Sequence, residues 1–187
     1  YPSIEGVIGR FDYNDVMAPT QVCDVFHLIC PPELITEEYR SAPAWIRLLN
    51  GSRVTFVGLH DYHASAGYGF AAIDQAEEVP EEIIRLLGGR VRQRLPNGKL
   101  PHHRILLTCN PHPNMEWFLD SARQYPDEFT FILSLPTDNP YTPAKFLQER
   151  RRSYTDDQYR RLVEGSWDVW EGQALSEFDR NWHVIEP

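Results

Sequence analysis

The sequence lacks the features that define several specialised classes of protein. Its three cysteines are an odd number spread over 187 residues, which excludes a disulfide scaffold. It has no run of about 18 consecutive apolar residues, so we expect no membrane span. It also has no excess of positive charge: 18 basic residues face 27 acidic ones, for a formal net charge of -9. Any contact with nucleic acid must therefore come from a local patch.

What is present is the composition of one ordinary globular domain. Hydrophobic residues make up 42% of the chain, enough to bury a core. Turn residues recur from end to end, with no internal repeat and no second domain evident. The first residue is Tyr1, directly before an expected strand, so we expect the chain to be a piece of a longer protein.

Apolar runs bounded by turn residues predict strands that alternate with helices. The expected strands span residues 4–10, 45–49, 53–59, 70–73, 104–109 and 129–133. The expected helices span residues 80–88, 114–124, 143–152 and 155–165, and Thr155 is the expected N-cap of the last of them. This alternation predicts an α/β fold with a largely parallel sheet covered on its faces. The strand at 104–109 is expected to be buried.

Two local signals are more specific. Asn50 and Gly51 separate two strand-like runs and predict a hairpin with a type I′ turn, in which both residues take positive φ angles. Val22, Val25, Phe26 and Ile29 have the spacing of core positions on a further helix. Cys23, His27 and Cys30 lie on the same stretch, and a zinc site that they form with His60 and His63 is a weaker alternative, because no Cys-X-X-Cys pair exists.

Polar residues follow two of the expected strands at the point where each strand ends. Asp74 ends the run Phe70–Ile73, and Glu77 and Glu78 come shortly after it. A carboxylate at the end of a parallel strand suits a hard divalent ion bound through its waters. Thr108 and Asn110 follow the run 104–107 and could hydrogen-bond a phosphate. Each segment alone is also typical of a simple polar turn.

Together the two segments resemble motifs of the large terminase subunits that package DNA in tailed bacteriophages. Residues 70–78 resemble the Walker B strand, and Thr108-Cys109-Asn110-Pro111 resembles the coupling motif. Further similar segments lie at residues 6–10, 49–56, 86–92 and 164–185, so the resemblance covers nearly the whole chain. It implies a RecA-like fold of the ASCE P-loop ATPase type, with a mostly parallel sheet flanked by helices and incomplete at its N-terminus.

The resemblance also implies roles for the site residues. Asp74 would hold Mg²⁺ through water, and Thr108 with Asn110 would relay the state of the γ-phosphate of ATP. Gln75 stands where the family has the carboxylate that orients the attacking water. Glu77 or Glu78 is expected to replace it, and Glu77 is preferred because it lies nearer the strand end.

Arginines are expected to neutralise charge on the transferred phosphoryl group. The candidates are Arg10, Arg90 and Arg92, with Arg10 the one assigned to nucleotide binding. The run Glu149–Arg152 and the pair Arg160-Arg161 are the most basic stretch and could contact DNA or a neighbouring subunit. A solvated helix face explains the basic stretch equally well.

The chain departs from the family in lacking the Walker A loop, since no Gly-rich segment ending in Lys-Ser/Thr is found. We therefore expect residues 1–166 to be an ATPase fragment truncated at its amino end. Residues 167–187 are expected to be a linker toward a nuclease domain that the sequence does not contain. The chain alone is expected to bind ATP weakly and to be inactive.

By resemblance, the intact protein would hydrolyse ATP to package double-stranded DNA into the procapsid. Its expected partners are the portal protein, the small terminase subunit and further copies in a ring, in the host cell cytoplasm and without a membrane. Two alternatives stay open. One is a non-catalytic ATPase-like module that binds DNA or protein, and the other is a helicase-like ATPase.

Overall fold

The computed structural model describes residues 1–60, 62, 66–143 and 145–168. The chain divides into two compact units, one spanning Tyr1–Cys109 and the other beginning at Asn110. The expected boundary between an ATPase fragment (1–166) and a linker (167–187) remains a prediction, and most of that linker lies outside the described residues. Among the described residues, no helix combines the length and the apolar character needed to cross a bilayer.

The first unit is built on a six-stranded sheet with strand order β2-β3-β4-β1-β5-β6. The strands are β1 (Glu5–Arg10), β2 (Ile35–Tyr39), β3 (Trp45–Leu48), β4 (Arg53–Gly58), β5 (Phe70–Ile73) and β6 (Arg104–Leu107). Strands β4, β1, β5 and β6 run parallel, whereas β2 and β3 pair antiparallel with their neighbours. This confirms the predicted α/β fold with a mostly parallel sheet.

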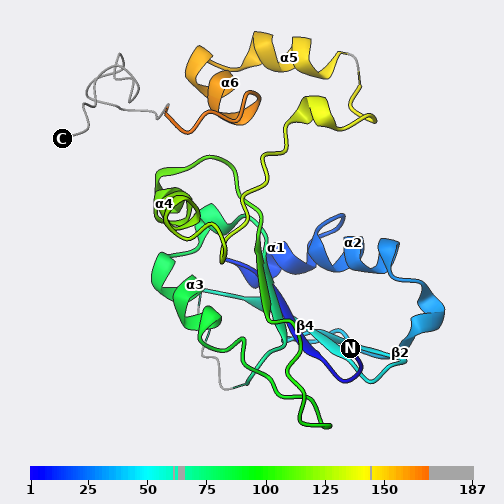
Figure 1. Ribbon diagram of the computed structural model, residues 1–187. Helices are drawn as coiled ribbons and strands as arrows, with labels where there is room; N and C mark the ends of the chain where they lie inside the picture. The colour runs from blue at the N-terminus through cyan, green and yellow to red at the C-terminus, as the bar shows by residue number, and fades with distance from the viewer. Residues whose placement is uncertain (61, 63–65, 144, 169–187) are drawn as a thin grey trace. The chain divides into compact units, whose positions relative to one another are not determined.

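Helices cover both faces of this sheet (Figure 1). They are α1 (Tyr13–Met17), α2 (Val22–Ile29) and α3 (Glu81–Gly88), with short 3₁₀ turns η1 (Pro32–Leu34) and η2 (Ala76–Glu78). Side chains alternate between the two faces along a strand. Ile8 packs against the core cluster beneath α1 and α2. On the other face Ile105 lies beside Gly88 at the end of α3.

The main core lies between α1, α2 and the antiparallel side of the sheet. Phe56 of β4 is fully buried there, and the ring of Phe26 from α2 meets it edge-on, with ring centroids 5.7 Å apart. The helix α1 approaches β4 so closely that a Cβ on Gly58 would lie 2.6 Å from the backbone nitrogen of Tyr13. The buried members of the cluster are Val16, Cys23, Ala44, Ile46, Val54 and Phe56.

The predicted hairpin between β3 and β4 is confirmed, but its turn is not type I′. Only Gly51 has a positive φ, of 79°, and Asn50 keeps a negative one. The Asn50 side chain instead accepts a hydrogen bond from the backbone N–H of Ser52, across 3.0 Å. An asparagine can close a turn with its side chain in this way, so the loop spans the four residues 49–52.

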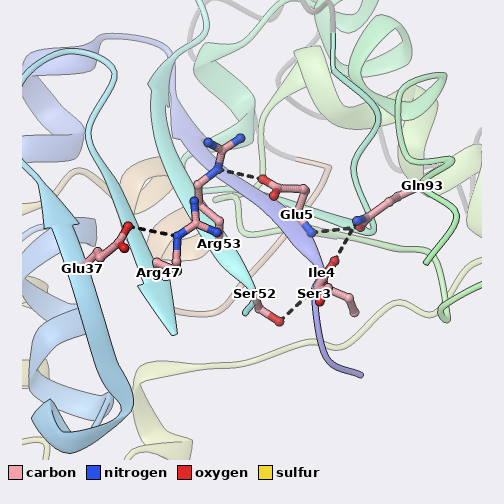
Figure 2. A network of polar contacts seen from close by, with 8 residues as sticks. All are labelled: Ser3, Ile4, Glu5, Glu37, Arg47, Ser52, Arg53 and Gln93. Atoms are coloured by element: carbon pink, nitrogen blue, oxygen red, sulfur yellow. Dashed lines mark hydrogen bonds and ion pairs between the residues drawn. The ribbon is translucent and has the colours of Figure 1, made fainter. Parts of the chain in front are cut away.

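Polar contacts join neighbouring strands at the end of the sheet where β1 begins (Figure 2). Arg53 of β4 pairs with Glu5 of β1 across 2.8 Å, and the two residues are direct partners in the register. Arg47 and Glu37 form the same kind of pair between β3 and β2, across 3.1 Å. The Gln93 side chain accepts from the backbone N–H of Glu5 at 2.9 Å. These contacts favour one register between neighbouring strands.

The second unit is helical in its described part. It contains η3 (Pro113–Met115), α4 (Glu116–Gln124), η4 (Pro136–Asp138), α5 (Phe146–Ser153) and α6 (Asp156–Leu162). Thr155 caps α6 as predicted. Its side chain accepts from the backbone N–H of Gln158, and the Gln158 side chain accepts from the backbone N–H of Thr155. Gly165 follows with a φ of 69°.

Two expectations about apolar segments are wrong, and a third is wrong in part. Residues 129–133 form no strand, and Ile132 is 78% exposed, because the described part of the second unit offers no strand for it to pair with. The strand β6 is not buried: it pairs with β5 alone among the described strands, and Leu106 is 62% exposed. Of the four expected core positions of α2, Val22 and Phe26 pack against the core cluster, whereas Val25 and Ile29 are exposed.

Candidate functional site

The carboxyl ends of β1, β5 and β6 lie along one edge of the sheet, because these strands are parallel neighbours. Arg10 ends β1, while Asp74 and Thr108 directly follow β5 and β6. The backbone N–H of Asp74 donates to the carbonyl of Gly9 across 2.9 Å. That of Thr108 donates to the carbonyl of Ile73 across 3.0 Å. The strand pairing therefore holds all three polar residues in place.

Asp74 and Thr108 are in direct contact. The Thr108 hydroxyl donates a hydrogen bond to Oδ1 of Asp74 across 2.7 Å. The Asp74 side chain is 38% exposed, so its carboxylate reaches solvent while one of its oxygens is held. The structure thus brings together the two strand ends that the sequence singled out. Asn110 is the first residue of the second unit, and its proximity to Asp74 remains a prediction.

Arg10 gathers three partners at this edge. Its guanidinium lies 3.6 Å from Oδ2 of Asp74 and 3.8 Å from Oε2 of Glu78. It also donates to the side-chain carbonyl of Gln21, the residue before α2, across 3.1 Å. Only 11% of the Arg10 side chain is exposed. The sequence carries no signal for Gln21, because its contact with Arg10 depends on how α2 packs against β1.

The chain turns sharply after Asp74, and this turn decides which glutamate faces the site. Gln75 has φ 54° and ψ 51°, a left-handed conformation that costs a residue with a Cβ about 1 kcal/mol. The turn η2 follows, and Glu77 becomes buried within it. Glu78 extends toward Arg10 and remains about half exposed. Glu78, rather than the preferred Glu77, is thus the glutamate that pairs with Arg10, and which of the two orients water remains a prediction.

Cys109 follows Thr108, and its thiol is unreactive at neutral pH. Burial is the main cause that raises the pKa of its thiol to about 11, and the Glu77 carboxylate adds to the effect. The thiol is therefore protonated at neutral pH and does not act as a nucleophile.

The residues at this edge fit a magnesium ion that accompanies a polyphosphate, and they do not build a complete metal cage. Among the described residues, no group of three or more His, Cys, Asp or Glu side chains converges as metal ligands would. Mg²⁺ commonly takes one or two carboxylates, keeps several waters and completes its shell with substrate phosphates. The partly exposed Asp74 suits that role. His63, one residue of the zinc alternative, lies outside the described residues.

A mostly apolar pocket of about 370 Å³ adjoins Asp74 and Thr108. One wall is α2, which contributes Val22 and Phe26, and the other is the face of the sheet beneath it. Sequence reasoning missed this pocket, because its walls come from elements that are distant in the chain. Its lining residues are Ile8, Thr20, Gln21, Val22, Val25, Phe26, Ile29, Ala72, Ile73, Asp74, Leu106 and Thr108.

Two of the three arginine candidates lie away from this edge. Arg90 and Arg92 flank Val91, which bridges to Tyr68 just before β5 begins. They therefore stand at the end of β5 opposite to Asp74, and a role for either of them in another subunit remains a prediction.

The basic stretch lies on α5 and α6 of the second unit, where aromatic rings and a carboxylate contact two of its arginines. Arg150 lies over the rings of Phe146 and Tyr154, with 5.0 and 5.4 Å to the ring centroids. Arg151 pairs with Asp156 across 2.7 Å. A contact of the basic stretch with DNA or with a neighbouring subunit remains a prediction.

Comparison with known proteins finds solved structures with a similar fold but no similar sequence among family models or curated proteins. No family model and no curated protein matches the sequence. Among solved structures, the chain is similar to the large terminase of a thermophilic bacteriophage, with a TM-score of 0.74 and 15% identity over 99% of this chain. The complex of that terminase with ADP gives a TM-score of 0.74 at 15% identity over the whole chain. Its complex with ATP-γ-S gives 0.69 at 15% identity, also over the whole chain.

The chain spans about half the length of these similar proteins, covering 45% of the first and 47% of the ADP complex. The likeness extends over both units, so it covers the segments before and after the Asp74 site. It confirms the predicted fold class: in its described residues, this chain has the fold of part of a phage large terminase.

Proposed function

We propose that this chain is part of the ATP-hydrolysing motor that packages double-stranded viral DNA, as the ATPase region of a phage large terminase subunit. The observation that carries this proposal is the hydrogen bond between Thr108 and Asp74, at the ends of two neighbouring parallel strands. Folds of this kind bind ligands at the carboxyl edge of the sheet. The similar phage terminase is solved with ADP and with ATP-γ-S, which supports a nucleotide as the ligand.

Asp74 is the residue that would hold Mg²⁺, through a bound water. The ion would neutralise charge on the phosphates of ATP. Thr108 restrains one carboxylate oxygen of Asp74 by its hydrogen bond. The second oxygen lies near Arg10, so both oxygens have defined surroundings. Such preorganisation is the main contribution a protein makes to phosphoryl transfer.

Glu78 is the better candidate to orient the attacking water. Its carboxylate contacts Arg10, which also contacts Asp74, whereas Glu77 is buried in η2. Gln75 can hydrogen-bond a water but cannot take up its proton. A glutamate four residues past Asp74 can replace it, because positioning contributes more than proton removal to this reaction.

Asn110 and Thr108 would report the state of the γ-phosphate to the rest of the protein. Asn110 begins the second unit, directly after the segment that ends at the site. The intact protein would act on double-stranded DNA in the host cytoplasm, as a ring of subunits with the portal protein and the small terminase subunit. These partners rest on the resemblance in sequence and fold.

The proposal is tested by titrating the ¹⁵N-labelled chain with Mg·ATP-γ-S. We expect weak binding, with a Kd of about 1 mM, since the Walker A loop is missing and the remaining contacts supply about 4 kcal/mol. The amide signals that shift should be those around Asp74 and Thr108. Asp74→Asn should abolish these shifts. Asp127→Asn, which removes the same charge from an exposed turn, should leave them unchanged.

Three outcomes would contradict parts of this interpretation. Shifts that persist unchanged in Asp74→Asn would place the nucleotide elsewhere. No shift at this edge, at nucleotide concentrations well above about 1 mM, would favour the non-catalytic interaction module. Micromolar affinity with steady turnover would refute the expectation that this chain alone is inactive.

A further inference from the structure

Arg10 joins three elements that are separate in the chain. It lies on β1, while its partners are Gln21 before α2, Asp74 after β5 and Glu78 at the end of η2. A guanidinium with 11% exposure needs partners for its donors, because an unpaired buried charge is costly. Gln21 accepts one hydrogen bond from it, the two carboxylates balance its charge from a longer distance, and its Nε has no hydrogen-bond partner among the described residues.

The distances show that these partners are not equivalent. The contact with Gln21 is a hydrogen bond of 3.1 Å. The carboxylates of Asp74 and Glu78 lie at 3.6 and 3.8 Å, beyond ordinary hydrogen-bond length. Arg10 thus places positive charge beside both carboxylates without a tight bidentate pair to either of them. Each carboxylate keeps the capacity to bind another cation or its water shell.

This arrangement has opposite consequences for two kinds of ligand. A free divalent cation at Asp74 meets the repulsion of a guanidinium only a few ångströms away, in a partly desolvated place where charges interact strongly. A divalent cation that arrives with a polyphosphate brings negative oxygens, and an arginine fork binds phosphate oxygens well. The same residue therefore weakens the first ligand and strengthens the second.

We propose that Arg10 makes the Asp74 site selective for a metal–polyphosphate complex over the free metal ion. This inference rests on the proposed function and deepens it, since it names the residue that sets the preference at that site. Arg10 acts as an internal counter-ion of Asp74 and Glu78, and it moves from the carboxylates toward the phosphates when the complex binds. The hydrogen bond to Gln21, the residue before α2, is retained and limits how far the guanidinium moves.

The test measures two affinities on the full chain. Binding of Mn²⁺ alone is followed by water-proton relaxation, and binding of Mg·ATP-γ-S by amide chemical shifts. Arg10→Gln should bind Mn²⁺ about tenfold more tightly and Mg·ATP-γ-S about tenfold more weakly, because one positive charge is lost a few ångströms from each ligand. A merely structural role would lower both affinities or neither.

Matched variants keep the test decisive. Arg53→Gln removes the same charge from a partly buried ion pair at the opposite end of β1 and should leave both affinities unchanged. Arg10→Lys keeps the charge and protects the fold should the glutamine variant not fold. It should leave the affinity for Mn²⁺ close to that of the parent chain and weaken the binding of Mg·ATP-γ-S by about threefold, since lysine keeps the positive charge but lacks the planar fork that binds two phosphate oxygens.

The outcomes separate this inference from the function on which it rests. If Arg10→Gln moves both affinities in one direction or moves neither, or if Arg10→Lys leaves the affinity for Mg·ATP-γ-S unchanged, the selectivity role is refuted while the site stands. If Asp74→Asn changes neither affinity, the proposed site itself is wrong, whatever Arg10 does.

Discussion

The contact between Thr108 and Asp74 is the feature on which the candidate site depends, and a double-mutant cycle tests it. Thr108→Val keeps the shape of the side chain and removes the hydroxyl that donates to Asp74. Asp74→Ala removes the acceptor. The cycle compares both single variants and the double variant with the parent chain, so effects that each substitution has on its own cancel.

The expected magnitude follows from the geometry. A hydrogen bond to a charged group contributes about 1.5–3 kcal/mol when it is buried, and about half of that when solvent competes for it. The distance of 2.7 Å is short, but the Asp74 side chain is partly exposed, so solvent does compete. We therefore expect a coupling free energy of about 1 kcal/mol between the two positions.

Urea unfolding followed by circular dichroism measures this coupling. Both residues lie in the first unit, so the transition that reports on that unit should shift. Thr108→Ser, which keeps the hydroxyl, should retain the coupling. If the two substitutions prove additive within about 0.3 kcal/mol, the strand ends do not meet as described and the reasoning about the site is refuted.

Three further predictions concern the surroundings of the site. Gly58→Ala should lower the free energy of unfolding by about 1–3 kcal/mol in urea titrations, because the new Cβ would meet the Tyr13 backbone; an unchanged midpoint would contradict the close approach of α1 to β4. Gln75→Gly should be more stable than Gln75→Ala by about 1 kcal/mol, since only glycine adopts the left-handed turn without strain, and the reverse order would exclude that turn. Cys109 should react with iodoacetamide only as the pH approaches 11, whereas the ordinary pKa of a thiol lies near 9. The folded chain should also lose stability between these two pH values, because the unfolded chain releases the thiol proton first. Glu77→Gln should lower the pH at which half of the thiol reacts, and an unchanged value would contradict an effect of the Glu77 carboxylate on Cys109.

Local signals in the sequence predicted most of the elements that carry the site. The β-branched run before Arg10 and the apolar run before Asp74 are each bounded by turn residues, and both are strands. The cap of α6 was also predicted correctly, because Thr155 contacts Gln158 only three positions away, and α3 begins within one residue of its expected start. The prediction that Asp74 and Thr108 emerge at one edge required only that their strands be parallel neighbours.

The errors share one physical cause, which is that burial depends on neighbours that lie elsewhere in the chain. The run that contains Ile132 has the composition of a strand, but backbone groups form a ladder only beside another strand. Leu106 looks like a core residue, yet its strand lies at the edge of the sheet. Composition describes what a segment can bury, and the packing of other segments decides whether it is buried.

By itself, the sequence determined most of the strands and helices, though not β2 or α1, and the residues that stand at the ends of the strands, because these follow from contacts between near neighbours in the chain. The tertiary structure alone decided that Arg10 reaches Gln21, Asp74 and Glu78, that Glu77 is buried, and that a pocket opens beneath α2. Such features arise where segments far apart in the chain meet, and their free energy depends on distance and burial, which only folding sets.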